Sequence, residues 1–305
     1  MSMRPMSLWE SHESTGEISL RELFDNPHLD IGGRTSEMGL EDLIFAACRG
    51  GWPASLSLRS RDAQLQTARD CVSAVCREDI SRIDGKRRNG KQAERILRSY
   101  ARHVSSFASD RTMLADVTSS GVSCSMDTFE DYTLALRRIS VIEDTDAWCP
   151  PVMSRTAIRR SAMRGFSDPS LAAALLGLSP EDLEVRMKTF GLIFLQMCIR
   201  DLKAYTAGEN GRITSFHDRY GLEADIVLHL DDGRYALVQC RPGSRGIEEG
   251  AGLLLKLRGL IRKRNAEEKQ MPIREPELLI VLTGGEMAYT RTDGVKVIPL
   301  ACLRD

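Results

Sequence analysis

The sequence predicts an α/β protein, mostly helical in its N-terminal and middle parts, with a strand-containing domain at its C-terminal end. Apolar residues recur at the three- and four-residue spacing of amphipathic helices through much of residues 40–205. Short apolar runs of strand length gather after residue 210, and Asp231-Asp232-Gly233 joins two of them as a hairpin turn. We therefore expect helices first and a mixed helix–strand domain last.

Composition narrows the class of protein. With 305 residues, 42% hydrophobic and 28% charged, the chain has the make-up of a folded globular protein with room for two or three domains. The net charge of -1 gives no overall attraction to nucleic acid or membranes, so any basic surface must be local. The eight Cys and five His do not cluster as zinc ligands do, and no apolar run is long enough to cross a bilayer. Without a signal peptide, these features predict a cytoplasmic protein with no membrane partner.

The first helices have clear start and stop signals. A short amphipathic helix is expected at residues 40–48, and Arg49-Gly50-Gly51-Trp52-Pro53 ends it, because two glycines and a proline terminate a helix. Helix then dominates residues 62–83. The polar, basic residues 84–90 are expected to form an exposed loop.

Residues 92–160 follow the order of a winged helix, in which three helices precede two wing strands. The expected elements are helices at 96–104, 110–117 and 126–139, then strands at 141–142 and 157–158. Ser109 is the expected cap of the second helix, and Ser125 or Asp127 that of the third. The third helix of such a module reads DNA in many proteins, but the same module also packs without any DNA role.

The C-terminal part alternates between the two kinds of element. Helices are expected at 172–176, at 185–205 after a cap at Ser179, and at 248–268. Strands are expected at 213–216, 224–230, 235–241, 278–282 and 295–299, with the last at a sheet edge.

The hairpin within residues 221–241 resembles the core of PD-(D/E)XK metal-dependent nucleases. In that core one strand carries an Asp and the next carries Glu-x-Lys, which together hold Mg²⁺ and orient the attacking water. Asp225 matches the first position, but Gln239 and Arg241 stand at the other two. An amide is a poor ligand for Mg²⁺, and an Arg is almost never deprotonated, so it does not replace the catalytic Lys. Glu223 and Asp225 share one strand face and would hold Mg²⁺ weakly.

Several strings of the chain, notably DPSLAAALLG at 168–177 and GLEAD at 221–225, resemble prokaryotic AAA-type (P-loop) ATPases with a C-terminal DUF4143 domain. The resemblance implies a P-loop ATPase module, a helical lid, a winged helix and a nuclease-like domain. It implies that residues 1–60 are a remnant of the ATPase module and lid, truncated before Met1. Residues 61–165 would then be the helical and winged-helix-like region, and residues 166–305 a degenerate nuclease-like α/β domain.

The same resemblance places a Glu of the nuclease-like site where Leu195 stands here. The site positions are therefore Leu195, Glu223, Asp225, Gln239 and Arg241, and we assign a catalytic role to none of them. The G-x-x-x-x-G-K match at residues 85–91 is a chance match, because no apolar strand precedes it and Gln92 has no hydroxyl for Mg²⁺. ATP and Mg²⁺ would be cofactors only if an ATPase module lay upstream.

Positive side chains gather in the loop before residue 92 and in the expected wing. The DNA-binding candidates are Arg87, Arg88, Lys91, Arg155, Arg159 and Arg160. Against this, acids at Asp127, Glu130 and Asp131 begin the expected reading helix and would repel a phosphate backbone. A basic run is also most often a solvated face.

The sequence thus predicts the non-catalytic C-terminal part of an ATPase-like protein, which binds DNA or a protein partner. One alternative is a weak Mg²⁺-dependent nuclease that uses Asp225 and Glu223. Others are an ATP-binding protein whose true start lies upstream, and a fragment without an independent role.

Overall fold

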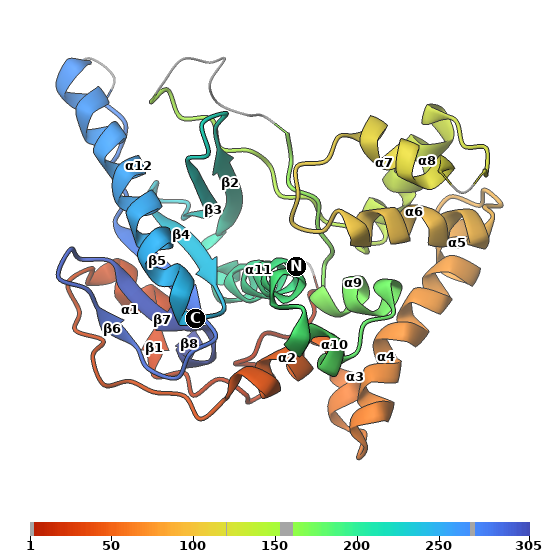
Figure 1. The fold of residues 1–305 in the computed structure, drawn as a ribbon, viewed down its shortest axis with the longest axis horizontal. Helices are drawn as coiled ribbons and strands as arrows, with labels where there is room; N and C mark the ends of the chain where they lie inside the picture. Colours follow the sequence, from red (N-terminus) through yellow and green to blue (C-terminus); the bar gives the residue numbers. More distant parts are fainter. Residues whose placement is uncertain (1–2, 120, 153–160, 269–271) are drawn as a thin grey trace. The chain divides into compact units, whose positions relative to one another are not determined.

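The computed structural model describes residues 3–119, 121–152, 161–268 and 272–305 (Figure 1). The chain divides into two compact units, which we describe separately. The helical unit comprises Met1–Met6, Ile44–Thr145 and Ser161–Met197, and the sheet unit comprises Ser7–Leu43, Asp146–Arg160 and Cys198–Asp305. These boundaries differ from the expected ones at residues 60 and 165.

The N-terminal segment explains part of that difference. Strand β1 (Ile18–Ser19) pairs in parallel with β8 (Leu303–Arg304), so residues far apart in sequence form one small sheet. Helix α1 (Leu20–Asp25) follows directly and buries Leu20, Leu23 and Phe24. Long-range strand pairing of this kind leaves no local signal in the sequence.

The helical unit contains most of the predicted helices. Its elements are α3 (Pro53–Leu56), α4 (Arg61–Ala74), the π-helical turn η1 (Val75–Asp79), α5 (Ile80–Arg82), α6 (Gly90–Arg102), α7 (Asp110–Thr118), α8 (Met126–Arg138), α9 (Pro169–Leu176) and α10 (Pro180–Val185). Helices α2 (Leu40–Arg49) and α11 (Met187–Tyr205) each have residues in both units. The predicted helices are confirmed, and so are their caps: Ser109 and Ser125 accept from backbone amides, and Ser179 forms a capping box with Asp182.

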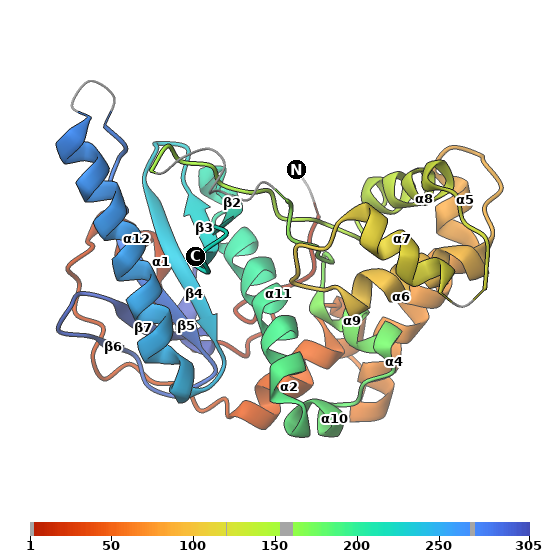
Figure 2. The same ribbon diagram turned by 45° about the horizontal axis from the view of Figure 1, so that its top comes forward.

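A shared apolar core holds the helical unit together. Fully buried Ile96 and Tyr100 of α6 belong to one cluster with Phe129 and Leu136 of α8 and with Leu171 of α9. Helix α6 runs beside α7 and α8 in Figure 2. The cluster also includes Val75 and Cys76 of η1, so the π-helical turn is anchored in the core.

The expected wing differs from the structure. Residues 141–142 form no strand: Ile142 makes an isolated antiparallel bridge to Phe166, and Thr145 makes another to Met163. The expected partner at 157–158 lies outside the described residues. The segment after α8 therefore pairs with residues just before α9, which the apolar pattern at 157–158 did not indicate.

The sheet unit is built on a six-stranded mixed sheet with the strand order β2-β3-β4-β5-β7-β6. Its strands are β2 (Arg212–His217), β3 (Glu223–His229), β4 (Tyr235–Arg241), β5 (Leu278–Thr283), β6 (Tyr289–Thr290) and β7 (Lys296–Pro299). Strands β2, β3 and β4 are antiparallel neighbours, and β5 is parallel to β4. The expected strands are confirmed, except that β7 lies between β5 and β6 and is not an edge.

Helix α12 (Ile247–Glu267) is the crossover between parallel strands β4 and β5 and covers one face of the sheet (Figures 1 and 2). Its Leu254, Leu257 and Ile261 are fully buried in one cluster with apolar side chains of the strands. Strand β4 is buried over six of its seven residues, which is typical of a strand covered on both faces. This central strand carries Gln239 and Arg241.

Candidate functional site

The hairpin of β3 and β4 brings four of the sequence-predicted site residues together. Ile226 is paired with Val238, which sets Asp225 opposite Gln239 and Glu223 opposite Arg241 on neighbouring strands. Since side chains alternate along a strand, all four lie on one face of the sheet. Glu223 and Asp225, which the sequence predicted as weak metal ligands, are thus on the same face as Gln239 and Arg241.

Arg241 supplies the positive charge in this cluster. Its Nη1 donates to Asp225 Oδ2 at 2.8 Å, and its Nη2 lies 3.7 Å from Glu223 Oε1. The backbone amide of Cys240 also donates to Asp225 Oδ2, at 2.8 Å. The carboxylate oxygens that would hold a cation therefore already face one from their own chain.

Burial sets the electrostatics of the two carboxyl groups. Burial raises the pKa of Asp225, and the nearby Arg241 guanidinium offsets only part of that rise. Burial also raises the pKa of Glu223, with a further contribution from the Asp225 charge. Both shifts favour the protonated form, which is a poor metal ligand.

Gln239 completes the cluster with one unsatisfied atom. The side chain is fully buried, and its Nε2 donates to the carbonyl oxygen of Glu223 at 2.8 Å. Its Oε1 has no hydrogen-bond partner among the described residues. In the described part of the chain, no three His, Cys, Asp or Glu side chains are grouped so that they could hold a metal ion.

Leu195, the fifth predicted position, lies on α11 within the helical unit, where its side chain is buried. The site that the structure describes in the sheet unit consists of the four positions on β3 and β4.

The predicted DNA-binding residues have different surroundings. Arg88 is a structural residue: its side chain is only 4% exposed and forms ion pairs with Asp84 at 2.7 Å and Asp131 at 3.0 Å. Arg87 and Lys91 are exposed and form no ion pair within the described chain. Arg155, Arg159 and Arg160 lie outside the described residues.

Asp131, one of the three acids at the start of α8 that would repel a phosphate backbone, is paired with two cations. Lys86 Nζ donates to Asp131 Oδ1 at 2.8 Å, and Arg88 donates to both oxygens of the same carboxylate, from Nε to Oδ2 at 3.0 Å and from Nη2 to Oδ1 at 3.2 Å. These two cations lower the pKa of the Asp131 carboxyl and offset its charge. Asp127 and Glu130 remain exposed acids on the same helix.

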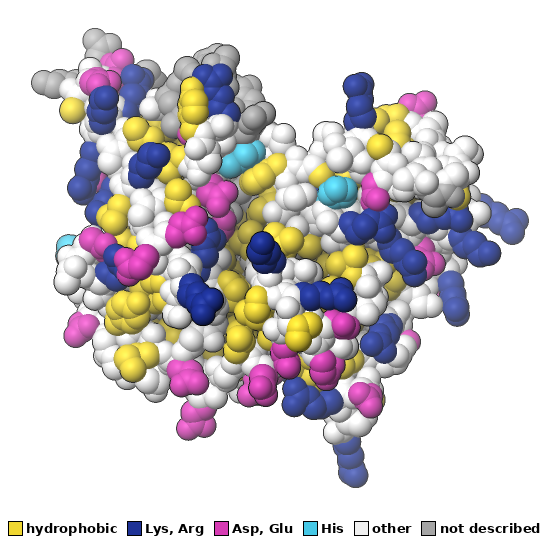
Figure 3. Space-filling view, viewed as in Figure 1, with side chains coloured by type: hydrophobic (Ala, Val, Ile, Leu, Met, Phe, Trp, Pro, Cys, Tyr) yellow, Lys and Arg dark blue, Asp and Glu magenta, His cyan; other side chains and the backbone are white. Residues whose placement is uncertain are grey.

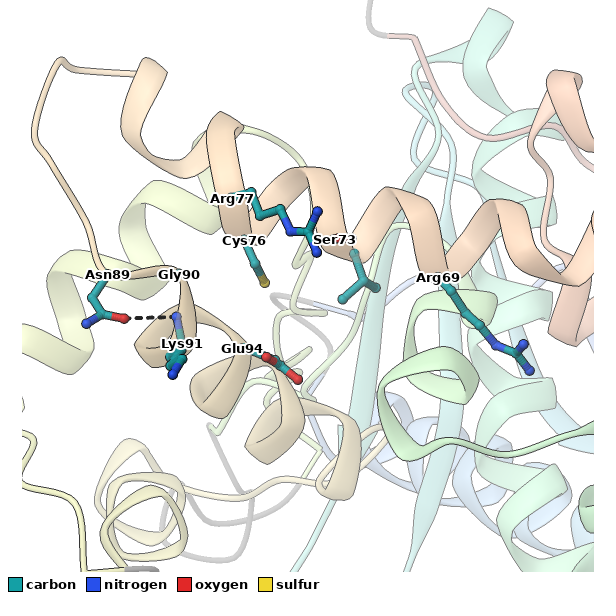
Figure 4. A pocket seen from close by; sticks show the side chains of 9 residues that line it. Arg69, Ser73, Cys76, Arg77, Asn89, Gly90, Lys91 and Glu94 are labelled. Carbon is teal, nitrogen blue, oxygen red and sulfur yellow. Dashed lines mark hydrogen bonds between the residues drawn. The ribbon is translucent and has the colours of Figure 1, made fainter.

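A pocket of about 700 Å³ lies between α4–η1 and the start of α6 (Figure 4). It is lined by Arg69, Val72, Ser73, Cys76, Arg77, Asn89, Gly90, Lys91 and Glu94. Lys91 was a predicted binding residue, but Arg69 and Arg77 were not. No local pattern identifies them, because they meet Lys91 only through the packing of two helices. On the face drawn in Figure 3, Lys and Arg side chains gather over α4 to α6.

Residues 40–182 match a protein-family model described as a domain of unknown function, DUF8612. The match contains every residue that lines this pocket. No curated protein matches the chain, and no solved structure does.

The resemblance to AAA-type ATPases with a DUF4143 domain is wrong, because neither family model matches the chain. The strings that suggested it are short and consist mostly of common apolar and small residues, which serve helix caps and buried strands in many folds. DPSLAAALLG, for example, forms the Asp168 cap and body of α9.

Among the helices of the described residues, none combines the length and the apolar character that a membrane span requires.

Proposed function

We propose that this protein is a non-catalytic nucleic-acid-binding protein whose sheet unit is a degenerate nuclease-like domain. One observation carries the proposal: the Arg241 guanidinium lies 2.8 Å from Asp225, where a nuclease of this type would hold its metal ion. A positive charge from the chain itself neutralises the carboxylate that would otherwise bind Mg²⁺.

The order of elements supports the nuclease-like assignment. In the sequence, α11 precedes the antiparallel strands β2, β3 and β4, which are followed by α12 and by β5 parallel to β4. The PD-(D/E)XK resemblance implies this same order of helix, three-strand meander, helix and strand. Asp225, Gln239 and Arg241 also fall on the two neighbouring strands where that resemblance expects an Asp and Glu-x-Lys.

Metal-dependent hydrolysis would require several changes at once. Mg²⁺ prefers charged oxygen ligands and an octahedral shell, whereas this cluster offers two carboxyl groups with raised pKa values and an amide. Arg241 would have to leave Asp225, and breaking a buried ion pair costs several kcal/mol. The weak-nuclease alternative therefore has little geometric support.

Nucleic-acid binding is supported by the cations of the helical unit. Arg87, Lys91 and Arg95 form no ion pair within the described chain, so their charges are available to an external anion. Phosphate contacts by such side chains release counterions and give binding that weakens steeply with salt. Arg88 is not one of these cations, because its guanidinium already forms ion pairs with Asp84 and Asp131.

Two assays test the proposal. Fluorescence anisotropy with labelled duplex DNA should show binding at low salt, with an affinity that falls linearly against salt on logarithmic axes. No binding at low salt would refute the nucleic-acid assignment. Plasmid cleavage with Mg²⁺ or Mn²⁺ should give identical traces for the wild type and Asp225→Ala, and cleavage lost in the variant would establish the nuclease instead.

A further variant tests the site geometry. The double change Gln239→Glu and Arg241→Lys restores the Glu-x-Lys pattern on β4. Cleavage gained by this variant, and lost again when Asp225→Ala is added, would show that the strands still hold the geometry of a metal site.

A further inference from the structure

The pocket between α4–η1 and α6 is positively charged along most of its length. Arg69, Arg77 and Lys91 are exposed and form no ion pair within the described residues. Figure 4 shows Arg69 at one end of the pocket and Lys91 at the other, with Glu94 between them. Among the described residues that line this space, three are therefore cationic and Glu94 is the single acidic one.

Glu94 is itself neutralised from outside the pocket. Its Oε1 lies 2.9 Å from Arg98 Nη2, one helical turn further along α6. Arg69 Nη1 donates a long hydrogen bond to Gln66 Oε1, at 3.5 Å. The pocket thus carries excess positive charge that no carboxylate of the described chain compensates.

The wall of the pocket is fixed by close backbone packing. A Cβ atom at Gly90 would lie 2.3 Å from the carbonyl oxygen of Cys76, so only glycine allows α6 to begin this near to η1. Cys76 is buried, and burial raises the pKa of its thiol to about 11, so this residue is a neutral part of the wall and no nucleophile. Both sides of the pocket therefore have a defined position before any ligand enters.

The π-helical turn η1 follows α4 and affects which side chains of this region face the pocket. Five residues, Val75–Asp79, form a π-helical turn within the run from α4 to α5. Single π-turns inside α-helices are frequent at functional sites, because the inserted residue changes which side chains share a face. Here the turn separates Arg69 on α4 from Arg77 within η1, and both line the same pocket.

The start of α6 is not the feature that attracts a ligand. Asn89 Oδ1 already accepts from the backbone amides of Lys91 and Gln92, so these helix-terminal donors are occupied. Binding in this pocket depends on the side chains of Arg69, Arg77 and Lys91.

We propose that this pocket binds the phosphate groups of a nucleotide, either free in solution or at the end of a nucleic-acid strand. Its volume of about 700 Å³ lies within the usual range for small-ligand sites and is far too small for a duplex. Arg offers paired N–H donors for phosphate, and Lys adds a compact positive charge. The strand-end form of this proposal deepens the proposed nucleic-acid binding and rests on it, whereas the free-nucleotide form does not.

The test uses the full chain and two labelled oligonucleotides that differ only at the 5′ end, which carries either a phosphate or a hydroxyl. Fluorescence anisotropy should show roughly ten-fold tighter binding of the phosphorylated strand, the effect of one good charge-assisted phosphate contact. Arg77→Gln and Lys91→Gln should each remove most of this preference. Unlabelled adenosine 5′-monophosphate should compete, and adenosine should not.

Arg111→Gln is the matched control, because Arg111 is an exposed cation on α7 that forms no ion pair in the described chain and lies outside the pocket lining. It removes the same charge and should leave the preference unchanged. Ser73→Phe fills the pocket without changing its charge and should weaken competition by adenosine 5′-monophosphate. Circular dichroism spectra that match the wild type show that each variant is folded.

The outcomes separate the two proposals. Equal binding of both strands, with no competition by adenosine 5′-monophosphate, overturns the pocket and leaves nucleic-acid binding standing. Direct binding of adenosine 5′-monophosphate that Lys91→Gln removes, without binding of either strand, supports the pocket and overturns nucleic-acid binding. The pocket is also overturned if Arg77→Gln and Lys91→Gln reduce the preference for the phosphorylated strand no more than Arg111→Gln does.

Discussion

The cluster on β3–β4 and the pocket on α4–α6 use the same kinds of charged side chain in opposite ways. In the sheet unit, Arg241 is partly buried and held by Asp225 at 2.8 Å. In the helical unit, Arg69, Arg77 and Lys91 are exposed, and no carboxylate of the described chain pairs with them. A paired charge stabilises the fold locally and offers little to a ligand, whereas an unpaired exposed charge is available for binding.

The comparison teaches that the number of cations in a segment does not identify a binding surface. Arg87 and Arg88 are neighbours in the sequence, yet Arg88 is a structural residue and Arg87 is free to bind. Which of two adjacent arginines contacts a ligand is decided by the acids that the fold places next to each.

The largest effect on stability is expected from breaking the ion pair of Asp225 with Arg241 in the sheet unit. Asp225→Ala leaves the partly buried Arg241 guanidinium with only the more distant Glu223 carboxylate, at 3.7 Å, which should lower the free energy of unfolding by about 3 kcal/mol. Urea unfolding measures the change. The double variant Asp225→Ala, Arg241→Met should recover most of the loss, since it removes the stranded charge. A single variant as stable as the wild type would mean that Arg241 does not depend on Asp225.

The sheet unit should also depend on pH through His229. The ring is half-buried, lies near Trp148 and Tyr235, and is 3.1 Å from Thr214 Oγ1. Burial, with a smaller contribution from Arg212, lowers its pKa from 6.5 to about 4. Because the folded state resists protonation, the stabilisation is present above pH 6.5 and is lost as the pH falls toward 4.

With allowance for partial solvent access, this loss should be about 2 kcal/mol. His229→Gln should flatten that part of the unfolding profile, measured by urea denaturation at several pH values. The raised pKa values of Glu223 and Asp225 act in the opposite sense and gain stability as the pH falls. The difference between the wild type and His229→Gln isolates the histidine, and parallel profiles would contradict the assignment.

Much of the fold could be predicted from the sequence. Helix caps such as Ser179 and the hairpin turn at residues 231–233 are local signals, and the elements they delimit are present. The pairing of β1 with β8 and the bridge from Ile142 to Phe166 were missed, since both join segments that carry no local mark of their partner.

The two candidate sites differ in the same way, because one rests on local sequence signals and the other on long-range packing. Period-two spacing was enough to predict that Glu223 and Asp225 share one strand face, whereas the ion pair of Asp225 with Arg241 was not predicted. The pocket needed Arg69 and Lys91 to meet across two packed helices, and the close approach at Gly90 that permits this is a tertiary feature. The family resemblance failed for a different reason, because short apolar strings report on caps and cores that many folds share.

A smaller effect should distinguish the two adjacent arginines. Arg88→Ala removes ion pairs to Asp84 and Asp131 and a hydrogen bond to the carbonyl oxygen of Ile80, so it should cost about 2 kcal/mol of unfolding free energy. Arg87→Ala should change stability by less than about 0.5 kcal/mol, as exposed unpaired positions do. Thermal or urea unfolding of both variants checks the contrast, and equal losses would show that exposure does not separate them.

The smallest effect is on nucleic-acid binding by Arg87 itself. If Arg87 contacts one phosphate, Arg87→Gln should reduce the slope of log affinity against log salt by about 0.9 for duplex DNA, with only a few-fold loss of affinity near physiological salt. Arg111→Gln on α7 removes an equal charge away from the loop and should leave the slope unchanged. Anisotropy titrations at several salt concentrations measure both. If the two variants reduce the slope equally, DNA responds to the overall charge of the helical unit. If only Arg87→Gln does so, a single exposed arginine contacts the phosphate while its neighbour Arg88 serves the fold.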